Sequence, residues 1–90
     1  MKHEEVIQQL QDVAQQLGIT LRYEQGNFEG GYCILKAQRL LLVNKRLTPA
    51  RKASVLATAL REIGLEGVFL TPVLRAYIED EAVRARKAAS

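Results

Sequence analysis

The first part of the chain carries the apolar pattern of a helix. Apolar side chains recur every three or four residues, at Val6, Leu10, Val13 and Leu17. This spacing is typical of a helix with one buried face, and it predicts a helix over residues 3–17. Gly18 follows, and a glycine at this point can adopt the left-handed conformation that ends many helices.

The pattern then changes to the alternation of strands. From residue 19 to residue 25, apolar and polar side chains alternate, which predicts a half-buried strand. Residues 32–36 and 39–44 are the second and third predicted strands, joined by a short link at Ala37 and Gln38. The glycine-rich connection before residue 32 is typical of a turn.

The third predicted strand is apolar at consecutive positions. The run consists of Leu40, Leu41, Leu42 and Val43. A strand that is apolar on both sides requires cover on both faces of its sheet. Helices can cover one face, so we expect the other face to be short, covered by the tail or buried against a second molecule. These four residues are therefore the candidates for self-association, and the expected assembly is a homodimer or a complex with a protein partner.

Two further helices are predicted over residues 49–63 and 72–87. Each begins with a Thr-Pro pair, which combines a good N-cap with a proline that the first helical turn tolerates. The end of the second helix is expected to fray, because its apolar pattern thins after Ile78. The chain is thus predicted to be a single α+β domain, with elements in the order α-β-β-β-α-α. We expect a small, largely antiparallel three-stranded sheet with the helices packed on one face.

Composition agrees with a small globular domain. Hydrophobic residues make up 48% and charged residues 26% of the 90 positions, with a net charge of +3. No apolar run approaches the roughly 18–20 residues that a membrane span needs. The polar N-terminus does not resemble a signal peptide, and a single cysteine allows no intramolecular disulfide. These features predict a cytoplasmic protein with no membrane contact.

Few residues offer catalytic or metal-binding chemistry. His3 is the only histidine and Cys33 the only cysteine, which is too few for the four ligands of a zinc site. His3 is also expected to lie at a fraying N-terminus, where a catalytic imidazole would not be held in place. No phosphate-binding loop motif is present. We therefore predict no catalytic residue, no metal and no cofactor. Cys33 is expected to be a small buried residue on a strand, with a reactive thiol as the alternative.

One stretch resembles a known family. Residues 40–47, which read Leu-Leu-Leu-Val-Asn-Lys-Arg-Leu, and the helix that follows them resemble the edge strand and active-site helix of ImmA/IrrE-type zinc metallopeptidases. Relative to the family's HExxH motif, Thr58 replaces the first histidine, Ala59 the catalytic glutamate and Glu62 the second histidine. The resemblance therefore implies a zincin-like remnant that has lost its metal ligands and its peptidase activity.

Basic residues gather around the start of the helix predicted over residues 49–63. They are Lys45, Arg46, Arg51 and Lys52. Cations are unfavourable at the positive end of a helix dipole, whereas the free N–H groups there attract anions. The cluster is thus a candidate site for an anion or an acidic partner. No aromatic residues that could stack on bases are interleaved with these cations, so nucleic acid is not the favoured ligand.

These observations favour a binding function over an enzymatic one. The leading prediction is a non-enzymatic interaction or regulatory module that associates with itself or docks a protein partner. The alternative is an anion-binding or nucleic-acid-binding protein that uses the basic loop.

Overall fold

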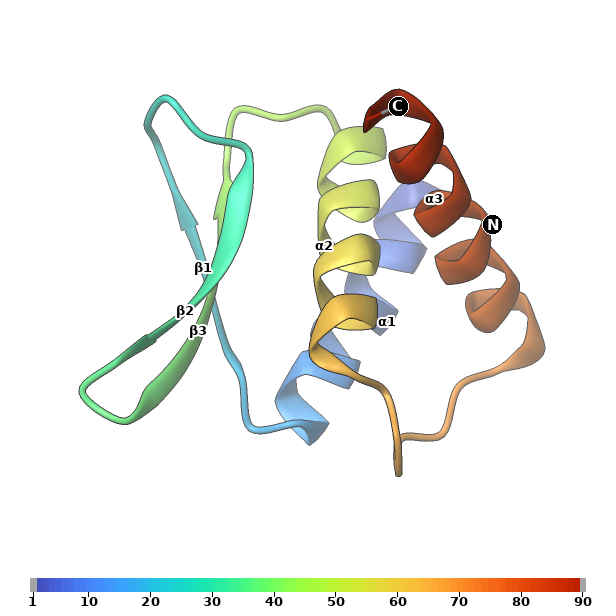
Figure 1. Cartoon of the computed structure of the whole chain (residues 1–90), viewed down its shortest axis with the longest axis horizontal. Coiled ribbons are helices and arrows are strands. Elements are labelled where there is room, and N and C mark those ends of the chain that lie inside the picture. The colour runs from blue at the N-terminus through green and yellow to red at the C-terminus, as the bar shows by residue number, and fades with distance from the viewer. Residues whose placement is uncertain (1, 90) are drawn as a thin grey trace.

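The computed structural model describes residues 2–89 and confirms the predicted α+β fold (Figure 1). The elements are α1 (His3–Gln16), β1 (Thr20–Glu24), β2 (Gly30–Leu35), β3 (Gln38–Asn44), α2 (Pro49–Ile63) and α3 (Pro72–Ala89). Their bounds agree with the predicted ranges to within two residues at each end.

The three strands form a mixed sheet in the order β1-β3-β2. β3 pairs in parallel with β1, with Leu40 opposite Thr20, and antiparallel with β2, with Gln38 opposite Leu35. The sheet is therefore mixed, with one parallel and one antiparallel pair, where the sequence predicted a largely antiparallel sheet. The chain leaves β1, forms the β2–β3 hairpin, and inserts β3 between the two earlier strands.

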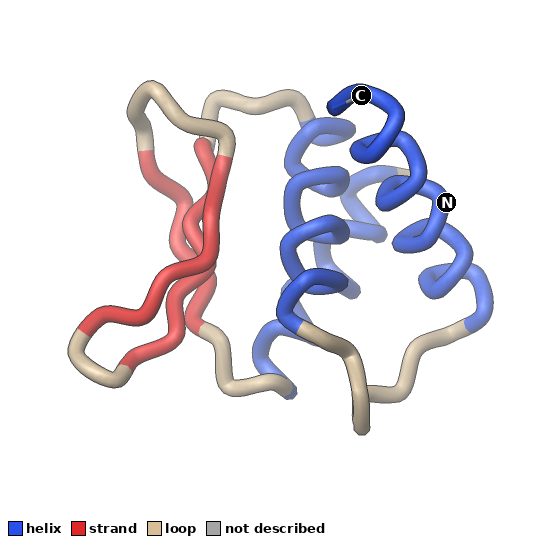
Figure 2. Tube along the Cα trace, in the orientation of Figure 1, coloured by secondary structure: helices blue, strands red, loops and turns tan. Residues whose placement is uncertain are grey.

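All three helices lie on one side of the sheet, as predicted (Figure 2). α2 is the central helix and packs against the sheet, α1 and α3, while α3 lies on the side of α2 away from the sheet (Figure 1). Leu41 and Val43 of β3 turn towards the helices and are fully buried among residues such as Leu10, Leu56 and Leu60. The core therefore lies between the sheet and the helices.

The helix ends follow the predicted chemistry. The Thr48 hydroxyl accepts a hydrogen bond from the Arg51 N–H at 3.3 Å, and the Thr71 hydroxyl accepts one from the Leu74 N–H at 3.2 Å. Gly18 follows α1 with a φ of 73°, the left-handed conformation that its position predicted.

The link between β2 and β3 differs from the prediction by one residue. The turn residues are Lys36 and Ala37, not Ala37 and Gln38, and their φ angles are 51° and 66°. Two-residue hairpins favour turns with positive φ because these match the twist of the strands. Here the pairing of β2 with β3 imposes positive φ angles on Lys36 and Ala37, two residues that do not favour them.

The last helix extends beyond its predicted end at residue 87. It continues to Ala89, and Ala82 and Glu81 of its second half are buried. The predicted fraying concerns the end of this helix; Ser90 lies outside the described residues.

Candidate functional site

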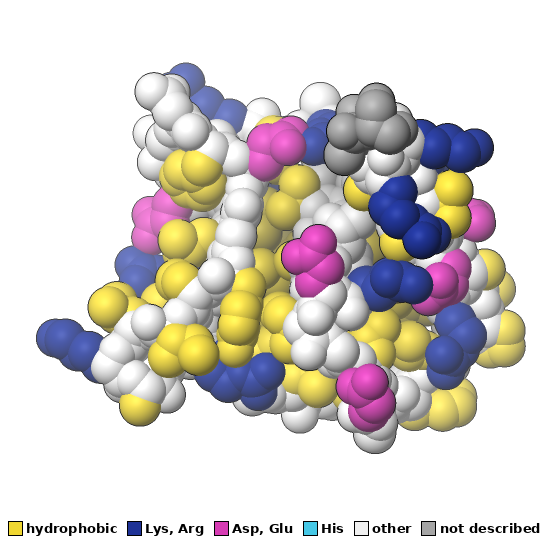
Figure 3. Space-filling view, viewed as in Figure 1, with side chains coloured by type: hydrophobic (Ala, Val, Ile, Leu, Met, Phe, Trp, Pro, Cys, Tyr) yellow, Lys and Arg dark blue, Asp and Glu magenta, His cyan; other side chains and the backbone are white. Residues whose placement is uncertain are grey.

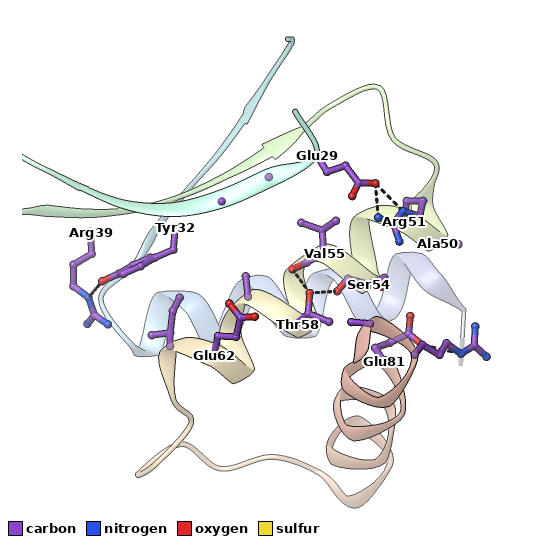
Figure 4. A pocket seen from close by; sticks show the side chains of 16 residues that line it. Glu29, Tyr32, Arg39, Ala50, Arg51, Ser54, Val55, Thr58, Glu62 and Glu81 are labelled. Atoms are coloured by element: carbon purple, nitrogen blue, oxygen red, sulfur yellow. Dashed lines mark hydrogen bonds and ion pairs between the residues drawn. The ribbon is translucent and has the colours of Figure 1, made fainter. Parts of the chain in front are cut away.

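A groove of about 1080 Å³ lies between the helix-facing side of β2 and the helices α2 and α3. Gly30 and Tyr32 form its wall on the strand side, and Val55, Thr58 and Glu62 of α2 form its floor (Figure 4). Side chains from the second half of α3 close one end. In the space-filling view, the strip between the sheet and α2 is largely hydrophobic, with isolated charged side chains (Figure 3).

Gly30 allows α2 to approach β2 closely. A Cβ atom at this position would lie 2.7 Å from Val55 Cγ1 and 2.6 Å from the Leu42 carbonyl oxygen. Any side chain here would push the strand away from the helix, so the glycine is required by packing. Val55, in the floor of the groove, is half-buried.

Tyr32 is held in a fixed position on the groove wall. Its hydroxyl accepts a hydrogen bond from Arg39 Nε at 2.9 Å, and the Arg39 guanidinium carbon lies 5.8 Å from the ring centroid. Arg39 is anchored in turn because Nη1 donates to the Leu17 carbonyl at 2.8 Å. These contacts orient an aromatic ring that remains 38% exposed.

The polar groups on the helices are partly engaged with one another. The Thr58 hydroxyl is directed to its own helix, 3.0 Å from the Ser54 carbonyl oxygen, and Glu81 pairs with Arg84 at 3.4 Å. That pair replaces the Asp80–Arg84 pair that the sequence spacing allows. Glu62 is exposed and has no ion pair among residues 2–89. Burial, with a smaller contribution from the Glu81 charge, raises the pKa of Tyr77 to about 12.

β2 is an edge strand whose outer backbone groups are free. Leu35 and Gln38 flank the two-residue turn, so they form the first hydrogen-bonded pair of the β2–β3 ladder. Such pairs alternate along an antiparallel ladder. The residues whose N–H and C=O groups point away from β3 are therefore Gly30, Tyr32 and Ile34. In the described part of the chain, no strand pairs with that side of β2.

The whole of β2 is exposed, and nothing in it discourages pairing. The strand reads Gly-Gly-Tyr-Cys-Ile-Leu, without a charge or a proline, and Ile34 and Leu35 are 66% and 54% exposed. The sequence interpretation missed this site because it looked for apolar surface on the third strand. The signal was the short uncharged apolar strand after Gly30 and Gly31.

The four residues proposed for self-association do not form one surface. Leu41 and Val43 belong to the core beneath the helices, while Leu40 and Leu42 turn to the open face of the sheet. On that face Leu40 is only 3% exposed and Leu42 is half-buried. Cys33 shares the open face and is exposed, so its expected burial is corrected.

The four basic residues are likewise engaged separately. The Arg51 guanidinium pairs with Glu29 at one end of the groove (Figure 4). Lys52 instead lies over the Tyr23 ring, with Nζ 5.7 Å from the centroid. The side chains of Lys45 and Arg46 are exposed in the loop before α2.

The three α2 positions that carried the metallopeptidase resemblance all line the groove. They are Thr58, Ala59 and Glu62. The strand before the helix, β3, is central, whereas the resemblance implied an edge strand; β1 and β2 are the strands at the two edges. Among the described residues, no group of three or more His, Cys, Asp or Glu side chains could hold a metal ion.

Comparisons with protein families, with characterised proteins and with solved structures found no match for this chain. Within residues 2–89, none of the helices has the length and apolar character needed to cross a membrane. The fold and the groove thus define a small α+β domain with an open sheet edge.

Proposed function

We propose that this chain is a non-enzymatic interaction module that accepts an extended protein segment as an additional strand at the free edge of β2. The observation that carries the proposal is the outward-facing row of backbone groups on an exposed, uncharged strand. Main-chain hydrogen bonds to such an edge supply affinity, and pockets for alternate side chains supply specificity.

The composition of the edge supports this proposal. Proteins usually protect edge strands with charges, prolines or bulges, because an unprotected edge pairs readily with other chains. β2 carries none of these features, and an apolar residue at its end, Ile34, is 66% exposed. An edge that is left open in this way is suited to recognition.

The groove beside the edge supports the same proposal. An added strand would direct every second side chain towards α2, where Val55 and Ala59 offer apolar contacts and Glu62 offers an unpaired carboxylate. We therefore expect bound segments to alternate between apolar residues facing the groove and polar residues facing solvent. A chain with one cysteine suits the reducing cytoplasm, where we propose that the module acts.

Anion or nucleic-acid binding through the basic loop has less support. Arg51 is paired with Glu29, and Lys52 lies over Tyr23 on another element. A phosphate would have to displace these contacts in order to recruit either side chain.

A selection from random peptides tests the proposal. Peptides enriched on the immobilised protein should bind Ile34→Pro at least about tenfold more weakly than the unmodified chain. Ile34→Thr is the matched control, because it keeps the outward N–H and a β-branched side chain, and it should retain binding. The proline removes a donor that is free in the structure and a side chain that is 66% exposed, so the fold should persist. Failure to enrich any peptide on a protein that remains monomeric, or equal binding to Ile34→Pro, would refute strand addition.

A further inference from the structure

We infer that the strand that covers the β2 edge is β2 of a second copy of this chain, paired antiparallel about a two-fold axis at Tyr32. This inference rests on the proposed function, because it names the occupant of the same edge. The two sheets would join into one continuous sheet, with the helices of both copies on the same face.

Hydrogen-bond alternation limits the ways in which the two strands can pair. Only residues whose backbone N–H and C=O groups point outward can form hydrogen bonds across the edge. These residues are Gly30, Tyr32 and Ile34. An axis at Tyr32 pairs this residue with its own counterpart. It also pairs Gly30 of each copy with Ile34 of the other, so every outward group on both strands obtains a partner.

The two ends of β2 are complementary in size. Ile34 is a β-branched residue that is 66% exposed, whereas Gly30 at the other end has no side chain and lies against Val55. In the proposed pairing, Ile34 of the second copy lies beside Gly30 and contacts the half-buried Val55. The two-fold axis repeats this contact, so the exposed Ile34 of each strand is covered by the other copy.

The charges that flank β2 are complementary as well. Glu29, which also pairs with Arg51 of its own chain, precedes the strand, and Lys36 follows it, with no charge between them. An antiparallel pair brings the acidic end of one strand to the basic end of the other, whereas a parallel pair would place like charges together. The sequence of β2 therefore favours antiparallel pairing with itself.

The register can be tested by a disulfide cross-link. With the axis at Tyr32, Gly31 lies directly opposite Cys33 of the second copy, in a non-hydrogen-bonded pair whose Cα atoms are about 4.5 Å apart. This separation is within the range of a disulfide. A Cβ atom at position 31 meets nothing within 4 Å, so Gly31→Cys should fold normally. Gly31→Ser is the matched control, since it leaves Cys33 without a thiol opposite.

The experiment mixes ¹⁴N-labelled and ¹⁵N-labelled Gly31→Cys under mild oxidation and examines the linked species by mass spectrometry. We expect hybrid dimers in which position 31 of one copy is linked to Cys33 of the other, and far fewer with Gly31→Ser. Native mass spectrometry of the unmodified chain should show a dimer that Ile34→Pro converts to monomer.

Two results would overturn the inference. One is a monomer at all concentrations without hybrid cross-links. The other is a dimer that persists in Ile34→Pro, which would place the interface elsewhere. If selected peptides still require the outward N–H of Ile34, strand addition holds and the occupant is a different protein. If the selected peptides bind without that N–H, the proposed function fails as well.

Discussion

At the scale of single residues, Asn44 ties the β1–β2 connection to the sheet. Its side chain is buried, and Nδ2 donates to the carbonyls of Gly26 at 2.9 Å and Phe28 at 2.7 Å. Its Oδ1 accepts from the Arg46 N–H at 3.0 Å. One amide thus organises both the loop that leads into β2 and the turn that leaves β3.

We expect Asn44→Ala to lower the free energy of unfolding by roughly 1–3 kcal/mol, because it removes three hydrogen bonds of a buried side chain and leaves two part-buried carbonyls without this donor. Urea denaturation measures this change. Asn27→Ala is the matched control, since Asn27 is exposed in the same loop, and it should change stability by less than about 0.5 kcal/mol. Equal effects of the two substitutions would contradict this role for Asn44.

Tyr77 provides a pH-dependent signal. Burial, followed by the neighbouring Glu81 charge, raises its pKa from 10.0 to about 12. Because the folded pKa exceeds the unfolded one, the associated stability is present below pH 10 and is lost as the pH rises towards 12. An absorbance titration should show a tyrosine step near pH 12 that disappears in Tyr77→Phe. Loss of a step near pH 10 instead would contradict this assignment.

At the scale of elements, the β2–β3 turn is a point where stability can be gained. Lys36 and Ala37 both adopt positive φ, which costs about 1–2 kcal/mol for an ordinary residue. Replacing them with Asn-Gly, the preferred pair for such turns, should raise the free energy of unfolding by about 1 kcal/mol or more. Thermal and urea unfolding measure the gain. Ala37→Val, a β-branched residue at the same position, should be destabilising, and a stabilising effect would contradict the turn geometry.

Helices α2 and α3 are joined by an ion pair that should respond to acid. The Arg61 hydrogen bond lowers the pKa of Glu79, and Arg61 Nε lies 3.1 Å from Glu79 Oε1. A depressed folded pKa contributes stability at neutral pH that is lost as the pH falls through it. Glu79→Gln should therefore be slightly destabilising at pH 7 and neutral at pH 2. Asp80→Asn, which removes the carboxylate of an exposed neighbour outside this ion pair, is the matched control.

The elements themselves were largely predictable because their signals are local. The Thr-Pro starts, Gly18 and the three-to-four-residue spacing of apolar side chains each depend on neighbouring residues, and the structure confirms them. The turn at Lys36 was misplaced by one residue because its conformation is imposed by strand pairing. No local preference of lysine or alanine indicates it.

At the scale of the whole molecule, the order of the strands could not be read from the sequence. The apolar run of β3 predicts a second sheet face that is short, covered by the tail or buried against a second molecule. In the structure β3 is the central strand, and Leu40 on its open face is only 3% exposed. The exposed apolar residues lie on β2, one strand earlier, where the sequence shows only a short segment after two glycines.

The central claim is that the outward amides of β2 are free in the monomer and become paired on association. Amide hydrogen exchange, followed by NMR at low and at high protein concentration, tests this most directly. In the dilute protein, Gly31, Cys33 and Leu35 should exchange slowly, and Gly30, Tyr32 and Ile34 rapidly. At high concentration the second set should become protected as well. Rapid exchange of Tyr32 and Ile34 at every concentration, while protection appears on another element, would contradict the claim.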